Sequence, residues 1–422
     1  MAPSNTVIWF LKGSITYSGG GEKLLLEGIA FFNKINIDTI LLLKKKTNFE
    51  NIFNGRYSPY QLSYECEILK FIPLINHLSN FLKLCIILSK FKGQVILANN
   101  AQSAFPLILI NIFKINKIKI ICFIHGSFYQ FSDDLLKYSY FFKSKIPIIF
   151  NLNQDYKLYI SVKRPRKSVL TILKSEITGI ISYIGGRYSN LIYVLSEKNR
   201  AEITILYKNT NVKVLKGAFA LNIYQELNKV KNQITNALNL NEHNVIFSLS
   251  RLVEKKRVDL IIKAFAISLL QNKKLFLIIG GTGQQKYYLQ NLVAQLGISE
   301  SVFFAGFIDE SDVLAYYNSC NVFISADLAD FDITAYVALA CAKKIIVPKD
   351  HEFSNELLNT QLVVRSDFDI QKLAETIIET INKKPITSIA EIKLIMYNYS
   401  WENYFTKISE DIYKFSIYTN AE

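Results

Sequence analysis

A short apolar run, a turn and then a helical segment recur through the second half of this chain. The apolar runs cover residues 245–249, 275–279, 302–304, 322–324 and 345–347. Runs that end in glycine or polar turns and alternate with helical patterns are typical of a parallel sheet of Rossmann type. The pattern therefore predicts an α/β domain in which ligands bind beyond the carboxyl ends of the strands.

The residues that follow these runs have the chemistry of a phosphate site. Arg251 and Lys256 follow the first run, and Gly281 and Gly283 follow the second. Arginine grips phosphate oxygens through two donors, lysine acts as a point charge, and glycine lets backbone amides approach a nucleotide closely. We therefore predict that these four residues bind a nucleoside diphosphate that carries a polar group. A charged loop and an ordinary turn at a strand end are the structural alternatives.

The order and spacing of these motifs resemble the C-terminal half of family 4 glycosyltransferases, which have the GT-B fold. That family has an arginine and a lysine at the spacing of Arg251 and Lys256, followed by Gly-x-Gly, a Val-x-Phe-x-Gly strand and a Glu-x7-Glu segment. Further segments that match the family are Gly281–Gly283, Val302–Gly306, Ala338–Cys341, Ser400–Glu402 and Gly19–Lys23. The resemblance spans nearly the whole chain and is densest between residues 245 and 347.

The resemblance implies two Rossmann-like domains that face a cleft, and a chain of 422 residues is long enough to form two such cores. Apolar runs in the first half predict strands at 6–10, 37–43, 95–97, 118–124, 191–195 and 212–215. We expect an acceptor-side domain over 1–217, a linker over 218–244, a nucleotide-sugar domain over 245–398 and a C-terminal helix over 399–422 that returns to the first domain.

Two motifs in the first half gain a role through the resemblance. In the family, the glycine-rich loop that matches Gly20 and Gly21 lies over the donor phosphates and borders the acceptor. A run of glycines has the mobility that a closing cleft needs. The family histidine that contacts the transferred sugar matches His125, which follows the apolar run 118–124. A flexible hairpin and a structural histidine are the alternatives.

The acidic loop departs from the family pattern. When Ala340–Lys343 is aligned with the Ala-Cys-Gly-Lys of the family, the two motif glutamates fall at Ala329 and Val337, and neither residue is acidic. The second glutamate normally binds the nucleotide ribose, which valine cannot do. A polar group that hydrogen-bonds a hydroxyl of the bound substrate contributes strongly to discrimination between substrates, so its loss should weaken substrate recognition.

Asp330 and Asp332 stand where the family has glycines, on either side of Phe331. We predict that one of the two aspartates takes over the sugar contacts. Asp330 and Asp332 are thus candidate catalytic residues together with His125, and Phe331 is a candidate substrate-binding residue. The alternatives are that both aspartates cap the helix expected from Ile333, that activity is low, or that the chain is an inactive relative.

Charge is distributed unevenly along the chain. Residues 1–210 contain 27 Lys and Arg against 12 Asp and Glu, a net of +15, whereas the remainder has 22 against 23, a net of −1. A basic half indicates a polyanionic partner. We find no nucleic-acid motif, so we expect an anionic membrane surface or a lipid-phosphate substrate. The cluster Lys163–Lys167 is the sharpest local case, and an ordinary charged loop is its alternative.

No window holds the roughly 18 uninterrupted apolar residues of a membrane-spanning helix. The nearest candidates, 68–91 and 104–124, are interrupted by lysines, and the N-terminus does not resemble an export leader. The five scattered cysteines favour a reduced compartment and no structural zinc. We therefore expect a cytoplasmic protein that is peripheral on the inner face of the cell membrane.

The resemblance implies retaining transfer of a hexose from a nucleoside-diphosphate sugar to a lipid-linked or polymeric glycan. We expect no cofactor and no metal, because Arg251 and Lys256 can supply the positive charge that the leaving diphosphate needs. A catalytically silent GT-B subunit that supports an active partner is the main alternative. An epimerase on the same fold would need acid-base carboxylates, and a phosphorylase would need a pyridoxal phosphate lysine motif, which we do not find.

Overall fold

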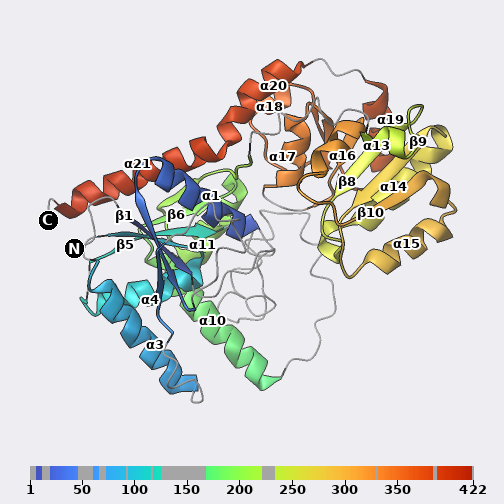
Figure 1. The fold of residues 1–422 in the computed structure, drawn as a ribbon. Helices are drawn as coiled ribbons and strands as arrows, with labels where there is room; N and C mark the ends of the chain where they lie inside the picture. Colours follow the sequence, from blue (N-terminus) through green and yellow to red (C-terminus); the bar gives the residue numbers. More distant parts are fainter. Residues whose placement is uncertain are drawn as a thin grey trace. The chain divides into compact units, whose positions relative to one another are not determined.

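The computed structural model describes residues 6–11, 20–45, 60–65, 73–91, 94–115, 117–124, 168–220, 233–327, 331–383 and 387–420. The chain divides into two compact units (Figure 1). Unit 1 comprises Met1–Lys216 together with Tyr404–Glu422, and unit 2 comprises Gly217–Asn403. His125, Asp330 and the Lys163–Lys167 cluster lie outside the described residues.

Unit 1 is built on a seven-stranded sheet whose strand pairs are all parallel, in the order β3-β2-β1-β4-β5-β6-β7. The strands are β1 (Thr6–Leu11), β2 (Asp38–Leu43), β3 (Tyr60–Ser63), β4 (Val95–Ala98), β5 (Lys119–Ile124), β6 (Leu191–Val194) and β7 (Val212–Val214). The helices are α1 (Gly20–Lys34), α3 (Pro73–Leu88), α4 (Ala101–Ile112), α10 (Val169–Arg187) and α11 (Glu197–Tyr207). Every residue of β1, β4 and β6 is buried, as expected for central strands covered on both faces.

The C-terminal helix α21 (Trp401–Asn420) packs on unit 1 from Tyr404 onward. The ring of Phe405 lies 5.7 Å from that of Phe31 and 6.0 Å from that of Phe32, both on α1. Further along α21, the carboxylate of Asp411 accepts a hydrogen bond from the Tyr193 hydroxyl at 2.5 Å. The predicted return of the terminal helix to the first domain is confirmed.

Unit 2 is built on a six-stranded parallel sheet in the order β10-β9-β8-β11-β12-β13. The strands are β8 (Asn244–Leu249), β9 (Leu275–Gly280), β10 (Val302–Gly306), β11 (Val322–Ile324), β12 (Lys344–Pro348) and β13 (Val363–Ser366). The strand order reverses between β8 and β11, which lie side by side at the centre of the sheet. A doubly wound sheet binds its ligand at this switch point, beyond the carboxyl ends of the strands.

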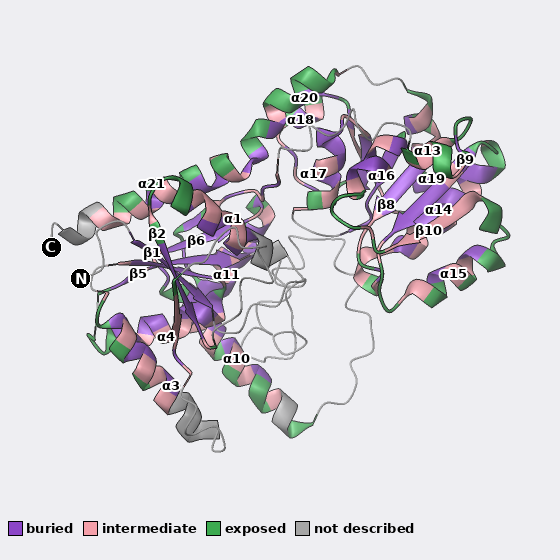
Figure 2. Ribbon diagram, in the orientation of Figure 1, coloured by how far each residue is buried: buried purple, intermediate pink, exposed green. Residues whose placement is uncertain are grey.

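Helices cover both faces of the unit 2 sheet, and the strands β8, β9, β11 and β12 between them are largely buried (Figure 2). One face is covered by α16 (Val313–Ser319), α17 (Ile333–Ala340), α18 (Asn355–Asn359) and α20 (Ile389–Met396). The other is covered by α14 (Val258–Gln271), α15 (Lys286–Gln295) and α19 (Ile370–Asn382). The shorter elements are α13 (Gln233–Ala237), η3 (Glu254–Lys256), η4 (Ser299–Ser301) and η5 (Tyr397–Tyr399).

The fold class predicted from the sequence is confirmed, since two parallel α/β sheets are present and each predicted apolar run contains a strand. The strands β3 and β13 were not predicted. The described residues of the expected linker 218–244 belong to unit 2. Phe219 donates its N–H to the Tyr399 carbonyl at 3.0 Å, and Leu240 is buried in the core. None of the helices in the described ranges is long and apolar enough to cross a membrane.

Candidate functional site

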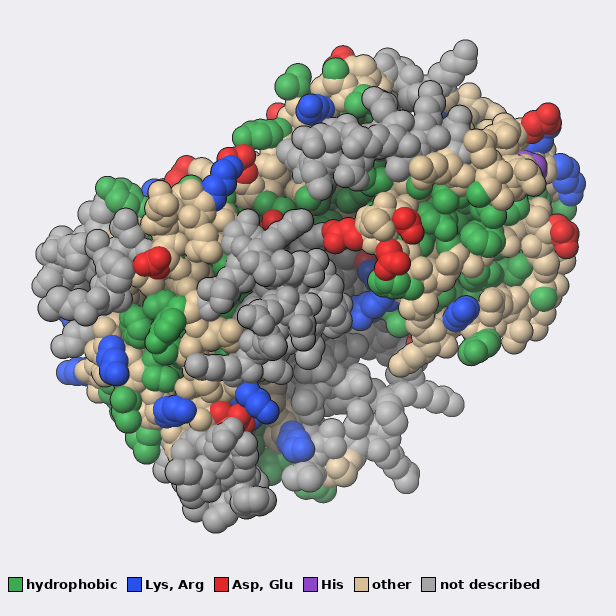
Figure 3. Space-filling model, in the orientation of Figure 1, with side chains coloured by type: hydrophobic (Ala, Val, Ile, Leu, Met, Phe, Trp, Pro, Cys, Tyr) green, Lys and Arg blue, Asp and Glu red, His purple; other side chains and the backbone are tan. Residues whose placement is uncertain are grey.

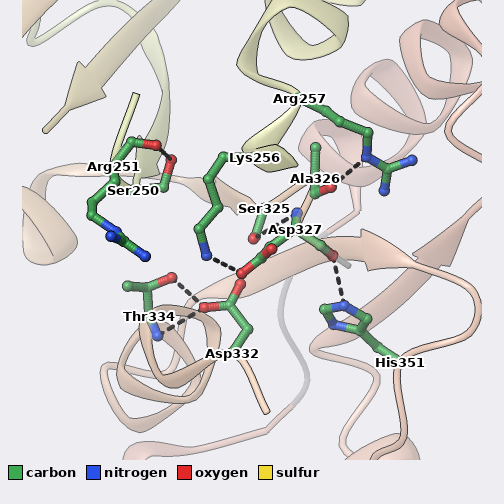
Figure 4. Close-up of polar contacts among 10 residues, drawn as sticks. All are labelled: Ser250, Arg251, Lys256, Arg257, Ser325, Ala326, Asp327, Asp332, Thr334 and His351. Carbon is green, nitrogen blue, oxygen red and sulfur yellow. Dashed lines mark hydrogen bonds and ion pairs between the residues drawn. The ribbon is translucent and has the colours of Figure 1, made fainter. Parts of the chain in front are cut away.

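Two loops meet at the switch point of unit 2 (Figure 4). The loop after β8 carries Arg251 and Lys256, and the loop after β11 begins with Ser325, Ala326 and Asp327. Because parallel strands direct their carboxyl ends to one edge of the sheet, these side chains come from neighbouring strands into one place. The sequence placed the cations at this edge, and the structure shows what surrounds them.

The glycine turn after β9 holds the Arg251 loop. The N–H of Leu252 donates to the Thr282 carbonyl at 2.9 Å, and the N–H of Gln285 donates back to the Leu252 carbonyl at 2.9 Å. The guanidinium of Arg251 is exposed and makes no hydrogen bond or ion pair with any residue of the described part of the chain. A fixed backbone thus presents a cation whose donors are available to a ligand.

Gly281 and Gly283 are needed for this close packing of two loops. A Cβ on Gly281 would lie 1.9 Å from the Ser250 carbonyl oxygen, and one on Gly283 would lie 2.3 Å from the Leu252 carbonyl oxygen. Gly281 also has φ +115°, and its N–H donates to the Gly306 carbonyl at 2.6 Å. The glycines therefore shape the Arg251 loop, and their predicted contact with a nucleotide stays a prediction.

Lys256 ends the 3-10 helix η3, and its Nζ forms an ion pair with the Asp327 carboxylate. The side chain of Lys256 is 20% exposed and that of Asp327 only 6%. The sequence did not single out Asp327. The one signal was its place directly after the apolar run 322–324, where polar residues interrupt the pattern.

The backbone around Asp327 is held at three points. Arg257 Nε donates to the Ala326 carbonyl at 2.8 Å, the Ser325 hydroxyl accepts from the Asp327 N–H at 3.4 Å, and His351 Nε2 lies 2.7 Å from the Asp327 carbonyl oxygen. His351 is itself buried. These bonds hold the backbone of Asp327, whose side chain is short, so that the long side chain of Lys256 is the more adjustable partner of the pair.

Asp332 is the N-cap of α17. Its Oδ1 accepts from the Thr334 N–H at 3.0 Å and from the Thr334 hydroxyl at 2.6 Å. Its Oδ2 is buried and has no hydrogen-bond partner among the described residues. The capping role is therefore observed, and one buried carboxylate oxygen is left over, which is costly unless a partner satisfies it.

The surroundings of Asp332 are aromatic and apolar. Burial first, and then the negative charge of Asp332, raises the pKa of Tyr317 well above its ordinary value. Phe331 stacks on Tyr336 with the ring centres 4.3 Å apart, and a Cβ on Gly217 would lie 2.5 Å from the Phe331 ring. Phe331 therefore packs within unit 2, and its predicted substrate contact stays a prediction.

The remaining predicted positions are placed as follows. Val337, at the place of the second family glutamate, is half-buried and packs against the unit 2 core. Gly20 and Gly21 form the start of α1 in unit 1. Within the described ranges no group of three His, Cys, Asp or Glu side chains is placed to hold a metal ion, and the expected independence from metal stays a prediction.

The part of the chain that holds this site resembles a known protein family. Residues 230–394 match the family model described as glycosyl transferases group 1. Unit 2 is thus similar to group 1 glycosyl transferases over most of its length. The match covers the whole switch-point site, from the Arg251 loop to the end of α17.

Curated relatives match over a part of the chain. Alpha-monoglucosyldiacylglycerol synthase of Streptococcus pneumoniae is 25% identical over 165 residues, which are 39% of this chain and 37% of the relative. An uncharacterized glycosyltransferase of Methanocaldococcus jannaschii is 28% identical over 107 residues, 25% of this chain and 27% of the relative. The chain thus spans well under half the length of either relative.

Solved structures match over nearly the full length. HepE of Anabaena in complex with UDP superimposes with a TM-score of 0.69 at 14% identity, covering 97% of this chain and 100% of that one. Its complex with UDP-glucose gives a TM-score of 0.67. At this identity the likeness shows the fold alone, and that fold is GT-B, as the sequence predicted.

Proposed function

We propose that this protein is a retaining glycosyltransferase that moves a hexose from a nucleoside-diphosphate sugar to a lipid-linked or polymeric glycan. The observation that carries the proposal is the exposed guanidinium of Arg251, beside the Lys256 loop at the switch point of a unit that is similar to group 1 glycosyl transferases. Two cations held at that place suit the diphosphate of a sugar nucleotide.

The named similarities support the substrate classes. The structural neighbour HepE binds UDP and UDP-glucose, which supports a nucleoside-diphosphate hexose as donor. The pneumococcal relative is named a synthase of a glucosylated diacylglycerol, which supports an acceptor attached to lipid.

The proposed reaction is a front-face substitution. The bond between the sugar C1 and the β-phosphate oxygen breaks, the acceptor oxygen bonds to C1 on the same face, and the acceptor proton passes to the departing diphosphate. Arg251 and Lys256 stabilise the charge that develops on the diphosphate. The Oδ2 of Asp332, which has no partner among the described residues, accepts a hydrogen bond from a sugar hydroxyl. His125 and Asp330 remain further candidates for sugar contacts.

Attachment to an anionic membrane at the cytoplasmic face is part of the proposal. Residues 1–210 have a net charge of +15, and basic residues near anionic lipid contribute about 1 kcal/mol each. Helix α10 also exposes an apolar stripe at a spacing of three to four residues, formed by Val169, Leu173, Ile177 and Ile180. Hydrophobic and basic side chains lie next to one another on the part of unit 1 that holds α3, α4 and α10 (Figure 3).

The decisive experiment measures donor binding and turnover by the purified protein. A thermal-shift screen against UDP, GDP and ADP sugars identifies the donor, and release of nucleoside diphosphate with and without lipid-linked glycan then reports hydrolysis and transfer. A glycosyltransferase is stabilised by one donor and releases its diphosphate faster when the acceptor is present. A chain that binds no donor, or binds one and never releases the diphosphate, is instead a silent GT-B subunit.

A further inference from the structure

We infer that Asp327 is an internal counter-ion that competes with the donor diphosphate for Lys256, and thereby weakens nucleotide binding. The inference rests on the proposed function and names a residue that limits affinity at that site. It starts from one contact, the ion pair between Lys256 Nζ and the Asp327 carboxylate.

The pair is the main electrostatic feature of the switch point. Within the described residues, Lys256 Nζ has no hydrogen-bond or ion-pair partner other than the Asp327 carboxylate. The site also holds Arg251, Arg257 and a second carboxylate, that of Asp332 (Figure 4), and Asp327 directly offsets the charge of Lys256. A diphosphate meets less attraction there than two unopposed cations would provide.

The backbone of Asp327 is held in place. Its loop is tied by Arg257 to the Ala326 carbonyl and by His351 to the Asp327 carbonyl. The lysine, by contrast, has a flexible four-carbon stem and three donors. A bound diphosphate must therefore draw Lys256 from Asp327 or share its ammonium, and the negative charge of Asp327 stays nearby in either case.

Two roles for Asp327 make opposite predictions. A positioning residue would hold Lys256 in its binding orientation, so removal of the carboxylate would weaken diphosphate binding. A counter-ion opposes the ligand charge, so its removal strengthens binding. The held backbone and low exposure of Asp327, together with its ion pair to Lys256, favour the second role.

The test compares Asp327→Asn with wild type by titration calorimetry, using UDP, GDP, ADP and inorganic pyrophosphate as probes. Asparagine keeps the size of the side chain and removes its charge. We expect pyrophosphate and the cognate diphosphate to bind roughly tenfold more tightly to Asp327→Asn, the scale of one unit charge near the ligand in a partly solvated site. The gain shrinks in high salt, which screens partly exposed charges.

The matched controls are Asp327→Glu, which keeps the charge, and Asp259→Asn. Asp259 forms an ion pair with Lys263 at 2.9 Å on α14, outside the site. Neither control is expected to tighten binding. Equal or weaker binding by Asp327→Asn, with wild type binding normally, overturns the counter-ion and leaves the proposed function intact. If neither wild type nor Asp327→Asn binds any probe, the switch point is not a diphosphate site and both proposals fail.

Discussion

Gly283 lies so close to the Leu252 carbonyl oxygen that a Cβ on the glycine would be 2.3 Å from it. The two residues belong to the turns that follow neighbouring strands, β9 and β8. This contact lets the glycine turn support the loop that presents Arg251. A motif that suggests nucleotide contact in the sequence is thus also required for packing.

Gly283→Ala is expected to destabilise unit 2 and to weaken nucleotide binding together. The atoms that the added methyl group would meet belong to the backbone of Leu252, which cannot shift without moving the Arg251 loop. The substitution should therefore lower the free energy of unfolding by about 2 kcal/mol, as overpacking typically does. Chemical denaturation and a UDP, GDP and ADP titration measure the two effects. Gly297→Ala is the control for backbone strain: its φ of +67° disfavours alanine, but its Cβ would meet nothing within 4 Å, so it should lose some stability and keep its nucleotide affinity. Unchanged nucleotide affinity in Gly283→Ala would show that the loop does not depend on the glycine.

Arg251→Ala is expected to reduce kcat/KM while leaving stability unchanged. The loss should be at least ~2 kcal/mol of transition-state stabilisation, the scale of one charge-stabilising group. Because the guanidinium is exposed and makes no contact with the described residues, its removal does not disturb the fold. The exposed Arg365 on β13 provides the matched control, Arg365→Ala. Near-normal turnover in Arg251→Ala would contradict the donor-site assignment.

Lys256→Ala is expected to lose both activity and stability. It leaves the Asp327 carboxylate buried without its cation, and breaking a fully buried pair costs about 3–5 kcal/mol. Lys256 is partly exposed, so we expect about 2 kcal/mol by denaturation. A variant that keeps wild-type stability would mean that water replaces the lysine as the partner of Asp327.

Much of the fold follows from the sequence because central parallel strands are continuous apolar runs. β1, β5, β8 and β11 were each predicted in place for that reason. The missed strands, β3 and β13, are edge strands and contain polar residues, such as Gln61 and Arg365. A strand that lies at an edge is buried less and so has a weaker apolar signal.

The candidate site was predictable only in part. Arg251 and Lys256 were found because their spacing along the chain is short and has family counterparts. Asp327 was not, because it meets Lys256 across 71 positions of sequence and only the strand order β8-β11 brings them together. The buried Oδ2 of Asp332, which has no partner among the described residues, could not be predicted either. Its burial depends on packing, whereas the sequence shows only that an aspartate precedes a helix.

Changing Asp332 to asparagine should distinguish its role as a helix cap from a role in binding the sugar. Asparagine caps helices as well as aspartate does, so Asp332→Asn keeps the bonds to Thr334 and the melting temperature changes little. A sugar contact through Oδ2 predicts a large fall in turnover for the same variant. Asp332→Ala provides the comparison, with a loss of about 1 kcal/mol from the missing cap. If Asp332→Asn and Asp330→Asn both keep full activity, neither aspartate replaces the family glutamates.

Membrane attachment should depend on salt and on α10. We expect wild type to float with anionic liposomes at low salt, and less at high salt, because the attraction decays within a Debye length of ~8 Å at physiological salt. Leu173→Asn with Ile177→Asn should weaken flotation, whereas Leu270→Asn with Leu394→Asn, at positions of unit 2 that are even more exposed, should not. Equal binding to neutral and anionic liposomes, or to neither, would contradict the proposal.

Asp411 binds the terminal helix α21 to unit 1, and its contribution to stability should depend on pH in the acid range. Asp411 is buried, which alone would raise its pKa, but the hydrogen bonds and charges of Lys213, Tyr193 and Lys414 lower the pKa below its ordinary value. A carboxyl group with a lowered pKa stabilises the folded state above its unfolded pKa of about 3.9, and this contribution is lost as pH falls through the folded pKa. Asp411→Asn should therefore cost about 2 kcal/mol at neutral pH, the scale of hydrogen bonds to a charged group.

The difference from wild type should begin to narrow when pH falls below about 4, where the carboxyl of the unfolded chain takes up a proton, and should be lost below the lowered pKa of the folded state. Urea denaturation at several pH values measures it, with Asp38→Asn at an exposed position of β2 as the control. A difference that stays constant from neutral to acid pH would show that Asp411 stabilises the helix by shape rather than by charge. Because Tyr193 and Lys213 lie on the strands β6 and β7, loss of the charge should release α21 before the sheet unfolds, and amide exchange along α21 would report that order.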